Sequence, residues 1–289
     1  MTNLDLTGLR VVVTGGGRGL GREICLGFAA AGANLVINDI FVDENGVAAA
    51  EQLASDITES GGTAYASDRN IATYAGGTGL IDDAIEQLGG VEVLITMAGN
   101  FSPKRFAEAG DEEWDSLSAV HLTGHVSTHR AAARWMIDNQ VAGRLITVAS
   151  RGALFGREVA YAGVKAAVLG LTTSMSVDLA EHCITANSVL PSAETQLFAI
   201  PAEMRRFGGM PLSESLDPQR VVSLCHYLAS PAADRVTGQF FYVAGDDVCL
   251  YELPFVERNR TTFCRSVGGW SAADLATLTD QLAATGGNR

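Results

Sequence analysis

A tyrosine and a lysine four residues apart, Tyr161 and Lys165, are the side chains of this 289-residue chain with the clearest chemistry. Residues at this spacing lie on one face of a helix, one turn from each other. A phenol is a poor base at neutral pH because its reference pKa is about 10. A cation within about 4–6 Å lowers that pKa by roughly 1–3 units, and Lys165 would supply it. Taken alone, the pentapeptide equally fits an amphipathic helix with one buried aromatic and one solvated lysine.

A glycine-rich turn at residues 14–21, with the sequence TGGGRGLG, follows an apolar strand pattern at 9–14 and precedes a helical pattern at 22–31. Glycines in such a turn let the backbone approach a pyrophosphate, and the free N–H groups of the helix N-terminus point at it. The spacing G-x-x-x-G-x-G differs from the common dinucleotide fingerprint. The strand before the turn, the helix after it and an acid at the next strand end together favour a dinucleotide site over a plain tight turn.

Asp39 stands at the end of a second strand at 35–38, where the ribose of a dinucleotide would lie. A carboxylate there accepts both ribose hydroxyls of NAD. It would repel a 2′-phosphate by roughly a few kcal/mol at about 4 Å and an effective dielectric near 20, so we expect NAD(H). Arg18 is the counter-argument, because an arginine in this loop could pair with that phosphate. The alternatives for Arg18 are a solvated side chain or a salt bridge with Asp39.

Strands and helices alternate without a break, which predicts an α/β fold with a doubly wound, parallel, Rossmann-type sheet and right-handed crossovers. Ligands of such sheets bind beyond the C-terminal ends of the strands. The expected strands are 9–14, 35–38, 63–67, 91–96 and 144–149, and the expected helices are 22–31, 46–60, 78–88 and 112–137. The residues at or just after strand ends are Gly21, Asp39, Asp68, Gly99 and Ser150.

Three of these strand-end residues suggest separate parts of one site. Asp68 would meet the adenine amino group of the cofactor, or it would merely cap the following helix. Gly99 would let the backbone pass close to the cofactor ribose. Ser150 places a hydroxyl on the same rim as Tyr161 and Lys165.

Composition and charge exclude several classes of function. The formal net charge of −13 disfavours nucleic acid and anionic membrane surfaces as partners. Hydrophobic residues make up 47% of the chain, enough for a sizeable core, yet no apolar run reaches the roughly 18 residues of a membrane span. The N-terminus lacks the features of a signal peptide, and the five cysteines are scattered without metal-ligand spacing. We expect a cytoplasmic protein that binds no metal.

With these residues in view, the sequence resembles the short-chain dehydrogenase/reductase family from about Leu6 to Gly245. The TGxxxGxG turn of that family matches residues 14–21, and its YxxxK motif matches residues 161–165. Residues 187–191 (NSVLP) resemble the segment that positions the nicotinamide, and residues 236–239 (VTGQ) resemble the start of the last strand. The resemblance implies NAD(P)-dependent oxidoreduction of a small molecule and a homotetramer or homodimer.

Several positions depart from the family pattern. The family motif NNAG reads TMAG at residues 96–99, and its Pro-Gly reads Pro191-Ser192. Ser150 precedes Tyr161 by 11 residues rather than the usual 13, which implies a loop shortened by two. Because Ser150 is the only serine near that strand end, we still assign it the role of the family's serine.

His121 occupies the position of the asparagine in the family's catalytic tetrad. A histidine there resembles the hydroxyacyl-CoA dehydrogenase part of peroxisomal multifunctional enzymes, as does the run Ile37-Asn38-Asp39. Two roles remain open for His121. It would relay protons between Lys165 and water, or it would only fill a bend of the helix.

The resemblance implies interconversion of a secondary alcohol and a ketone, with Tyr161 as the acid/base. Ser150 would hold the substrate oxygen, and Lys165 would hold the ribose hydroxyls and keep Tyr161 acidic. The expected catalytic residues are Ser150, Tyr161, Lys165 and His121. The residues expected to bind the cofactor are Gly15, Gly17, Arg18, Gly19, Leu20, Gly21, Asp39, Asp68, Arg69, Ala98, Gly99, Tyr161, Lys165, Pro191, Ala193 and Thr195.

The substrate is indicated only by its surroundings. Residues 192–217 are expected to form a lid that mixes apolar side chains with Arg205 and Arg206. This mix suits an apolar substrate with an anionic handle, such as an acyl-CoA, or it places the arginines at the surface. Arg151 and Arg157 are further candidates for binding that anion. Hydroxyacyl-CoA, steroid and cyclic alcohols are therefore the candidate substrates.

Residues 1–249 are expected to form one domain, and residues 250–289 a C-terminal extension that is too short to hold a core of its own. The alternative to an enzyme is a non-catalytic NAD(H)-binding redox sensor or partner protein on the same fold. The changes at residues 96, 97 and 121 give that alternative some support, whereas the intact Ser150, Tyr161 and Lys165 argue against it.

Overall fold

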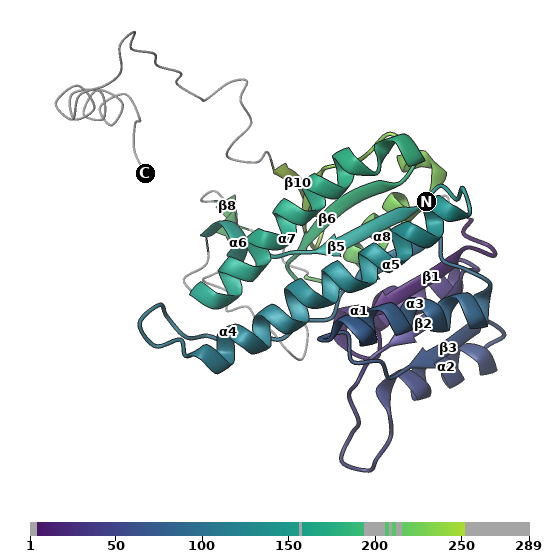
Figure 1. Ribbon diagram of the computed structural model, residues 1–289, viewed down its shortest axis with the longest axis horizontal. Helices are drawn as coiled ribbons and strands as arrows, with labels where there is room; N and C mark the ends of the chain where they lie inside the picture. The colour runs from purple at the N-terminus through teal and green to yellow at the C-terminus, as the bar shows by residue number, and fades with distance from the viewer. Residues whose placement is uncertain (1–4, 156–157, 194–205, 208–209, 212–215, 252–289) are drawn as a thin grey trace, which may run out of the picture. The chain divides into compact units, whose positions relative to one another are not determined.

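The computed structural model describes residues 5–155, 158–193, 206–207, 210–211 and 216–251 (Figure 1). An eight-stranded sheet lies at their centre, in the order β10-β9-β6-β5-β4-β1-β2-β3. All neighbouring strands are parallel except β10, which pairs antiparallel with β9. The strands are β1 (Arg10–Thr14), β2 (Asn34–Asn38), β3 (Thr63–Ser67), β4 (Val93–Thr96), β5 (Arg144–Val148), β6 (Thr185–Pro191), β9 (Phe240–Ala244) and β10 (Asp247–Tyr251).

The strand order reverses at β1. From β1 the chain builds outward to β2 and β3 on one side, and then returns to add β4, β5 and β6 on the other. The predicted doubly wound, Rossmann-type sheet is therefore confirmed. In such sheets the ligand lies at this point of reversal, outside the carboxyl ends of the strands. The ends of β1 and β4 thus mark where a cofactor belongs.

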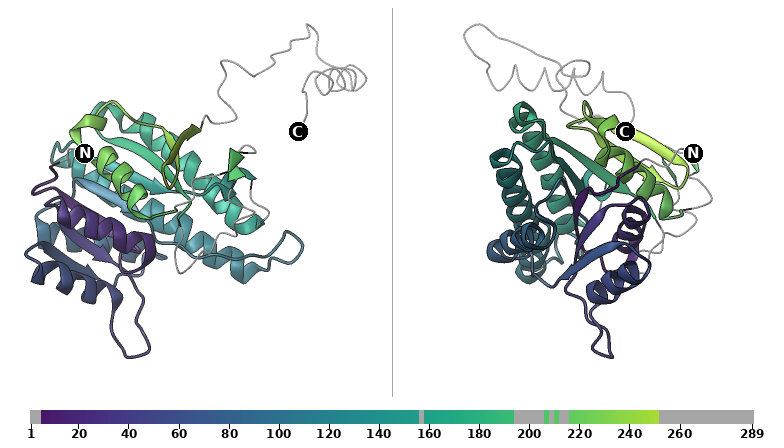
Figure 2. Two further views of the ribbon diagram at one scale, coloured as in Figure 1. Left: turned by 180° about the vertical axis from the view of Figure 1, so that it is seen from behind. Right: turned by 90° about the vertical axis from the view of Figure 1, so that its right-hand side faces the viewer.

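Helices cover both faces of the sheet, as the views from behind and from the side show (Figure 2). Val11 and Val13 of β1 pack on one face with α1, α2 and α8, whereas Val12 packs on the other face with α3 and α5. Burial on both faces explains the continuous apolar runs of the central strands. The helices are α1 (Gly19–Ala30), α2 (Ala49–Glu59), α3 (Tyr74–Leu88), α5 (Gly124–Asp138), α7 (Val159–Asp178) and α8 (Gln219–Ala229).

The long helix predicted at 112–137 is present but not uniform. It consists of α4 (Asp111–Ser118), a π-helical segment (Ala119–Thr123) and α5, in direct succession. The backbone N–H of Gly124 bonds to the carbonyl oxygen of Ala119, five residues back. Segments of this kind are rare and occur often at functional sites. His121 lies in the middle of this one, so the predicted bend is real and has a defined geometry.

The predicted strands agree with the observed ones within two residues at each end, but three helix starts are wrong. The helix α1 begins at 19 rather than 22, α2 at 49 rather than 46, and α3 at 74 rather than 78. Glycine is a poor helix former, so Gly76 and Gly77 argued against an early start of α3. The structure places them inside the helix, and glycine lets α3 pack closely on α5, because a Cβ at Gly77 would lie 1.8 Å from the Ser127 hydroxyl.

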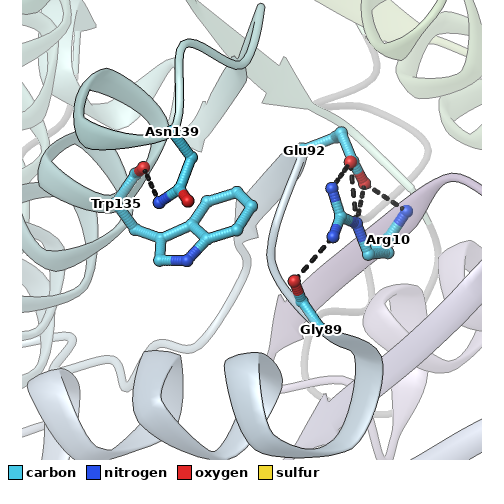
Figure 3. A network of polar contacts seen from close by, with 5 residues as sticks. All are labelled: Arg10, Gly89, Glu92, Trp135 and Asn139. Atoms are coloured by element: carbon cyan, nitrogen blue, oxygen red, sulfur yellow. Dashed lines mark hydrogen bonds and ion pairs between the residues drawn. The ribbon is translucent and has the colours of Figure 1, made fainter.

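The end of the sheet opposite the strand C-termini is held by a polar network (Figure 3). The guanidinium of Arg10, at the start of β1, pairs with the carboxylate of Glu92 just before β4 and donates a 2.7 Å bond to the carbonyl oxygen of Gly89. It also lies 5.2 Å from the ring centroid of Trp135 on α5. This network joins the two strands between which the chain reverses.

Within the described residues, the structure contains no helix with the length and apolarity to cross a membrane.

Candidate active site

Tyr161 and Lys165 lie one turn apart near the start of α7, as predicted. The Lys165 Nζ is 5.8 Å from the centroid of the Tyr161 ring. The same nitrogen donates a 2.7 Å hydrogen bond to the carbonyl oxygen of Val148, the last residue of β5. This bond fixes the buried lysine at the C-terminal edge of the sheet, next to the point where the strand order reverses.

Ser150 follows the end of β5 and faces the tyrosine. Its hydroxyl accepts a 3.0 Å hydrogen bond from the backbone N–H of Gly152. A Cβ at Gly152 would lie 3.3 Å from the Ser150 Oγ and 3.4 Å from a ring carbon of Tyr161, so both side chains flank this glycine. Ser150 and Tyr161 also share a side-chain hydrogen bond. The three predicted residues therefore meet, although the loop between Ser150 and Tyr161 is short.

The pKa shift of Tyr161 differs from the expectation. Burial raises the pKa of the Tyr161 phenol above its usual value, the hydrogen bond with Ser150 lowers it, and the charge of Glu158 raises it further. Burial also lowers the pKa of Lys165 to about 7. The prediction that Lys165 lowers the pKa of Tyr161 is wrong for this state, because loss of solvent disfavours both charged forms. Further hydrogen bonds or charges must stabilise the phenolate before it forms near neutral pH.

His121 lies beside the same tyrosine, edge-on, with the ring centroids 5.7 Å apart. Its Nε2 is 3.0 Å from the carbonyl oxygen of Asn100, and this contact, shorter than the 3.4 Å to the Asn100 backbone nitrogen, places the imidazole proton on Nε2. Burial, together with the charge of Lys165, lowers the pKa of His121 to about 3. The ring is therefore neutral near pH 7. It fills the π-helical bend, and its Nδ1 is left as an acceptor.

The glycine turn forms a cradle at the ends of β1 and β4. Gly15 has a φ of +64°, and a Cβ there would lie 2.7 Å from the Cα of Ala98. A Cβ at Gly21 would lie 2.1 Å from the carbonyl oxygen of Gly15. Arg18 precedes α1 without capping it through its side chain. The free N–H groups of the first turn of α1 are thus available to an anion, as a pyrophosphate site requires.

Asp39 lies directly beside this turn. Its Oδ2 accepts a 3.1 Å hydrogen bond from the backbone N–H of Gly17, and its Oδ1 accepts a 3.0 Å bond from the N–H of Phe41. A Cβ at Gly17 would lie 3.0 Å from the carboxylate. Each carboxylate oxygen keeps a lone pair, so Asp39 is held in place and still able to accept ribose hydroxyls.

Arg18 is exposed, as one of the alternatives for it expected. Its guanidinium carbon lies 3.4 Å from the ring centroid of Phe41, in an exposed cation–π contact. Among the ion pairs of the described residues, none joins Arg18 to Asp39. The proposed salt bridge is therefore wrong, and the aromatic ring holds the arginine at the edge of the cradle.

Asp68 and Arg69 follow the end of β3. Asp68 is exposed, and α3 is capped by Thr73, whose hydroxyl accepts a 3.0 Å bond from the N–H of Gly76. The alternative that Asp68 caps this helix is wrong. Arg69 pairs with Asp83 of α3 at 2.8 Å, so its side chain is engaged away from the glycine turn. A cofactor contact by Arg69 would use its backbone, which Asn38 holds through a 2.9 Å bond to the carbonyl oxygen.

Ala98 and Gly99 follow β4 and lie beside the glycine turn. The backbone N–H of Ala98 donates a 3.1 Å bond to the Thr14 hydroxyl, which ties the segment after β4 to the glycine turn. A Cβ at Gly99 would lie 2.8 Å from the His121 ring, so only glycine fits between the imidazole and this segment. Both residues therefore join the cradle to the catalytic side of the site.

The end of β6 closes the other side of the cradle. Pro191 is the last residue of the strand, and Ala193 is buried in the same apolar cluster as Leu20 of α1. Thr195 and Arg157 lie outside the described residues, as does most of the lid expected at 192–217. Two short strands of that segment, β7 (Arg206–Phe207) and β8 (Met210–Pro211), pair with each other.

Phe101 is a site residue that we did not predict. Its ring lies edge-on to Tyr161 with the centroids 5.1 Å apart, and its side chain is 40% exposed. It also lines a cavity of about 570 Å³ whose other walls come from residues 100–117. A loop aromatic carries no sequence signal, whereas the four-residue spacing of His121, His125 and His129 is visible in the sequence.

Arg151, predicted as a possible anion site, donates a 3.2 Å bond to the hydroxyl of Tyr242.

Comparison with known proteins agrees with this geometry. The family model described as short chain dehydrogenase matches residues 10–199. The chain is 37% identical to hydroxyacyl-CoA dehydrogenase ChsB1 of Mycobacterium tuberculosis over 96% of this chain and 90% of that protein. It is 30% identical to peroxisomal multifunctional enzyme type 2 of Mus musculus over 84% of this chain, but it spans only 32% of that longer protein.

A solved short chain dehydrogenase from Mycobacterium avium superposes with a TM-score of 0.85 at 31% identity, covering 99% of this chain and 98% of that one. The fold thus agrees with sequence and structural relatives alike. The protein belongs to the short chain dehydrogenase family and is an oxidoreductase that interconverts alcohols and ketones.

Proposed function

We propose that the protein is an NAD(H)-dependent dehydrogenase of secondary alcohols, with a hydroxyacyl-CoA thioester as the preferred substrate class. The single observation that carries the proposal is the meeting of Ser150, Tyr161 and Lys165 at the carboxyl edge of the sheet, beside a glycine cradle that ends at Asp39. The turn suits a dinucleotide because a Cβ at Gly15 or Gly21 would collide with the backbone of Ala98 or Gly15, so only glycine allows its tight path, and because no side chain caps the first amides of α1.

The chain's own residues would orient the substrate and move one proton. When bound, the nicotinamide cofactor supplies the hydride acceptor. The Ser150 hydroxyl donates a hydrogen bond to the substrate oxygen, and Tyr161 removes the proton from the alcohol. The Lys165 ammonium holds the ribose hydroxyls and stabilises the phenolate. The ammonium would donate hydrogen bonds to the ribose hydroxyl oxygens, and the phenolate would accept one from the substrate hydroxyl. These are hydrogen bonds that the buried pair lacks without ligands.

The substrate class rests on the surroundings of Tyr161. Phe101 forms an apolar wall against the tyrosine and opens onto the cavity of about 570 Å³, which has room for an acyl chain. The relative from Mycobacterium tuberculosis is named as a hydroxyacyl-CoA dehydrogenase and aligns over nearly the whole chain. We further propose a homodimer or homotetramer, as the family resemblance implies, and a cytoplasmic location.

The proposal is tested by following NADH absorbance with NAD and a panel of hydroxyacyl-CoA thioesters, hydroxysteroids and cyclic alcohols. We expect turnover, with the highest kcat/KM for a hydroxyacyl-CoA. The same panel with NADP is expected to be slower throughout. Tight NADH binding without turnover of any alcohol would instead favour a redox sensor that uses the fold without its chemistry.

Asp39→Ala is expected to reduce the preference for NAD over NADP by about a hundredfold, measured as the ratio of kcat/KM values. The carboxylate no longer accepts the ribose hydroxyls or repels a 2′-phosphate, a difference of roughly 3 kcal/mol. Asp68→Ala is the matched control, because it removes an exposed acid at the neighbouring strand end and should change both cofactors equally. An unchanged ratio in Asp39→Ala would contradict the assignment of NAD.

A further inference from the structure

Three buried histidines follow one another at four-residue spacing along the π-helical segment and α5. The side chains of His121, His125 and His129 are 1%, 2% and 2% exposed. The rings of His125 and His129 stack, with centroids 5.6 Å apart and planes inclined by 13°. The buried face of this helix therefore carries an imidazole at every turn, starting at the catalytic tyrosine.

Most ring nitrogens of this stripe form no hydrogen bond of normal geometry within the described part of the chain, although the backbone of His121 still interacts with the His125 ring. The His129 Nδ1 donates a 2.8 Å bond to the carbonyl oxygen of His125, which leaves its Nε2 as an acceptor. The Nε2 of His129, both ring nitrogens of His125 and the Nδ1 of His121 form no hydrogen bond of normal geometry there, and neither does the Thr96 hydroxyl at the end of β4. Buried polar atoms without protein partners are usually satisfied by internal water.

The first two histidines of the stripe, His121 and His125, lie within electrostatic range of the catalytic lysine. The charge of Lys165 contributes to the lowered pKa values of both His121 and His125. One of the three N–H bonds of the ammonium points to the carbonyl oxygen of Val148. An ammonium donates and a bare imidazole nitrogen accepts, so a water molecule between them satisfies both groups.

The other charged groups around Lys165 in the described part of the chain do not stabilise its ammonium. Glu158 of α7 acts on Tyr161, and the carboxylates of α4 are at its outer side, where Glu113 pairs with Lys104. The strands β4 and β6 contain no titratable side chain, and Arg144 of β5 pairs with Asp234. Burial alone accounts for the lowered pKa of Lys165. Hydration held by the histidines is thus the available means of keeping this amine protonated.

We propose that His125 and His129 are positioning residues: His125 holds internal water against Lys165, and His129, stacked on His125, extends that water, so that the ammonium stays hydrated beside Tyr161. The inference rests on the proposed function, in which Lys165 stabilises the Tyr161 phenolate. Neither histidine touches the substrate or the cofactor in this arrangement. Each acts through water and through the lysine.

The test is to replace each histidine by leucine, which has a similar size and no acceptor. Without the water the ammonium and the phenolate are both less stable. The pH midpoint below which alcohol oxidation is lost should therefore rise by about one unit, and kcat at pH 7 should fall about tenfold. The KM values for alcohol and NAD should stay within about twofold, because binding groups are untouched. His125→Gln keeps polar atoms and should restore the native midpoint.

His226→Leu on α8 is the matched control. His226 is also partly buried with an unpartnered Nε2, but it packs edge-on against Phe28 at 4.6 Å on the opposite face of the sheet. We expect its pH midpoint to equal that of the native protein. A shift as large as that of His125→Leu would mean that any buried histidine changes the profile, and it would overturn the inference.

Two further outcomes would refute the role of the stripe. Leucine variants of His125 and His129 that keep the native midpoint and kcat would show a purely structural role. A high-resolution crystal structure without ordered water at their unpartnered nitrogens would do the same, whether or not an active substrate is known. Failure of the proposed function is recognised separately, because the native protein would then oxidise no alcohol in the panel.

Discussion

Tyr161→Phe is expected to lower kcat for alcohol oxidation by about a thousandfold, within the range that a positioned acid/base contributes. The change removes one hydroxyl and keeps the aromatic ring that contacts Phe101 and His121. The fold should therefore stay intact, and the Kd for NADH should change by less than about threefold. Steady-state kinetics and NADH fluorescence titration measure the two quantities.

Tyr65→Phe is the matched control for this variant. Tyr65 is 39% exposed on β3, at the far edge of the sheet from α7, and the same loss of a hydroxyl should leave kcat unchanged. A Tyr161→Phe protein with near-native turnover would refute the acid/base assignment. Because burial raises the pKa of Tyr161, oxidation by the native protein should accelerate as the pH rises, while ketone reduction needs the protonated phenol.

Gly21→Ala is expected to weaken NADH binding by about a hundredfold or more. Its new Cβ would lie 2.1 Å from the backbone carbonyl oxygen of Gly15, so the turn must open. The amides at the start of α1 would then leave the pyrophosphate, and hydrogen bonds to charged groups contribute about 1.5–3 kcal/mol each. The crowding should also lower the free energy of unfolding by about 1–3 kcal/mol.

Gly170→Ala is the matched control for Gly21→Ala. It adds a methyl group to a helix without changing the glycine turn. Gly170 is exposed on α7, and an added Cβ would have no atom within 4 Å outside its own stretch of helix. The substitution should stabilise the protein by about 0.5–1 kcal/mol and leave the Kd for NADH unchanged. Thermal unfolding and fluorescence titration of both variants provide the comparison. Native NADH affinity in Gly21→Ala would refute the cradle as the pyrophosphate site.

The order of elements could be predicted because it depends on short-range patterns. Apolar runs such as that of β1 indicate strands buried on both faces, and glycine turns and single acids at strand ends mark the edge where a ligand lies. The spacing of Tyr161 and Lys165 also required only the geometry of one helix. The helix starts were harder to predict, because packing of α3 on α5 overrode the low helix propensity of Gly76 and Gly77.

The state of the catalytic groups could not be predicted in the same way. The pKa of Tyr161 depends on how much water its neighbours exclude, and those neighbours include Ser150 after β5, Phe101 after β4 and His121 in the π-helical segment. The contact of Arg18 with Phe41 and the capping of α3 by Thr73 likewise depend on loop geometry. None of these contacts follows a periodic pattern.

The sequence by itself determined the sheet and the edge at which the candidate site lies, and it indicated the side chains proposed to react, because helix and strand periodicities and the steric freedom of glycine are local properties. Only the tertiary structure decided the direction in which the pKa values of Tyr161 and Lys165 shift, the position of Arg18 and the unpartnered nitrogens of the histidine stripe. Desolvation and hydrogen bonding are sums over atoms from several elements, so they exist only once those elements have packed together.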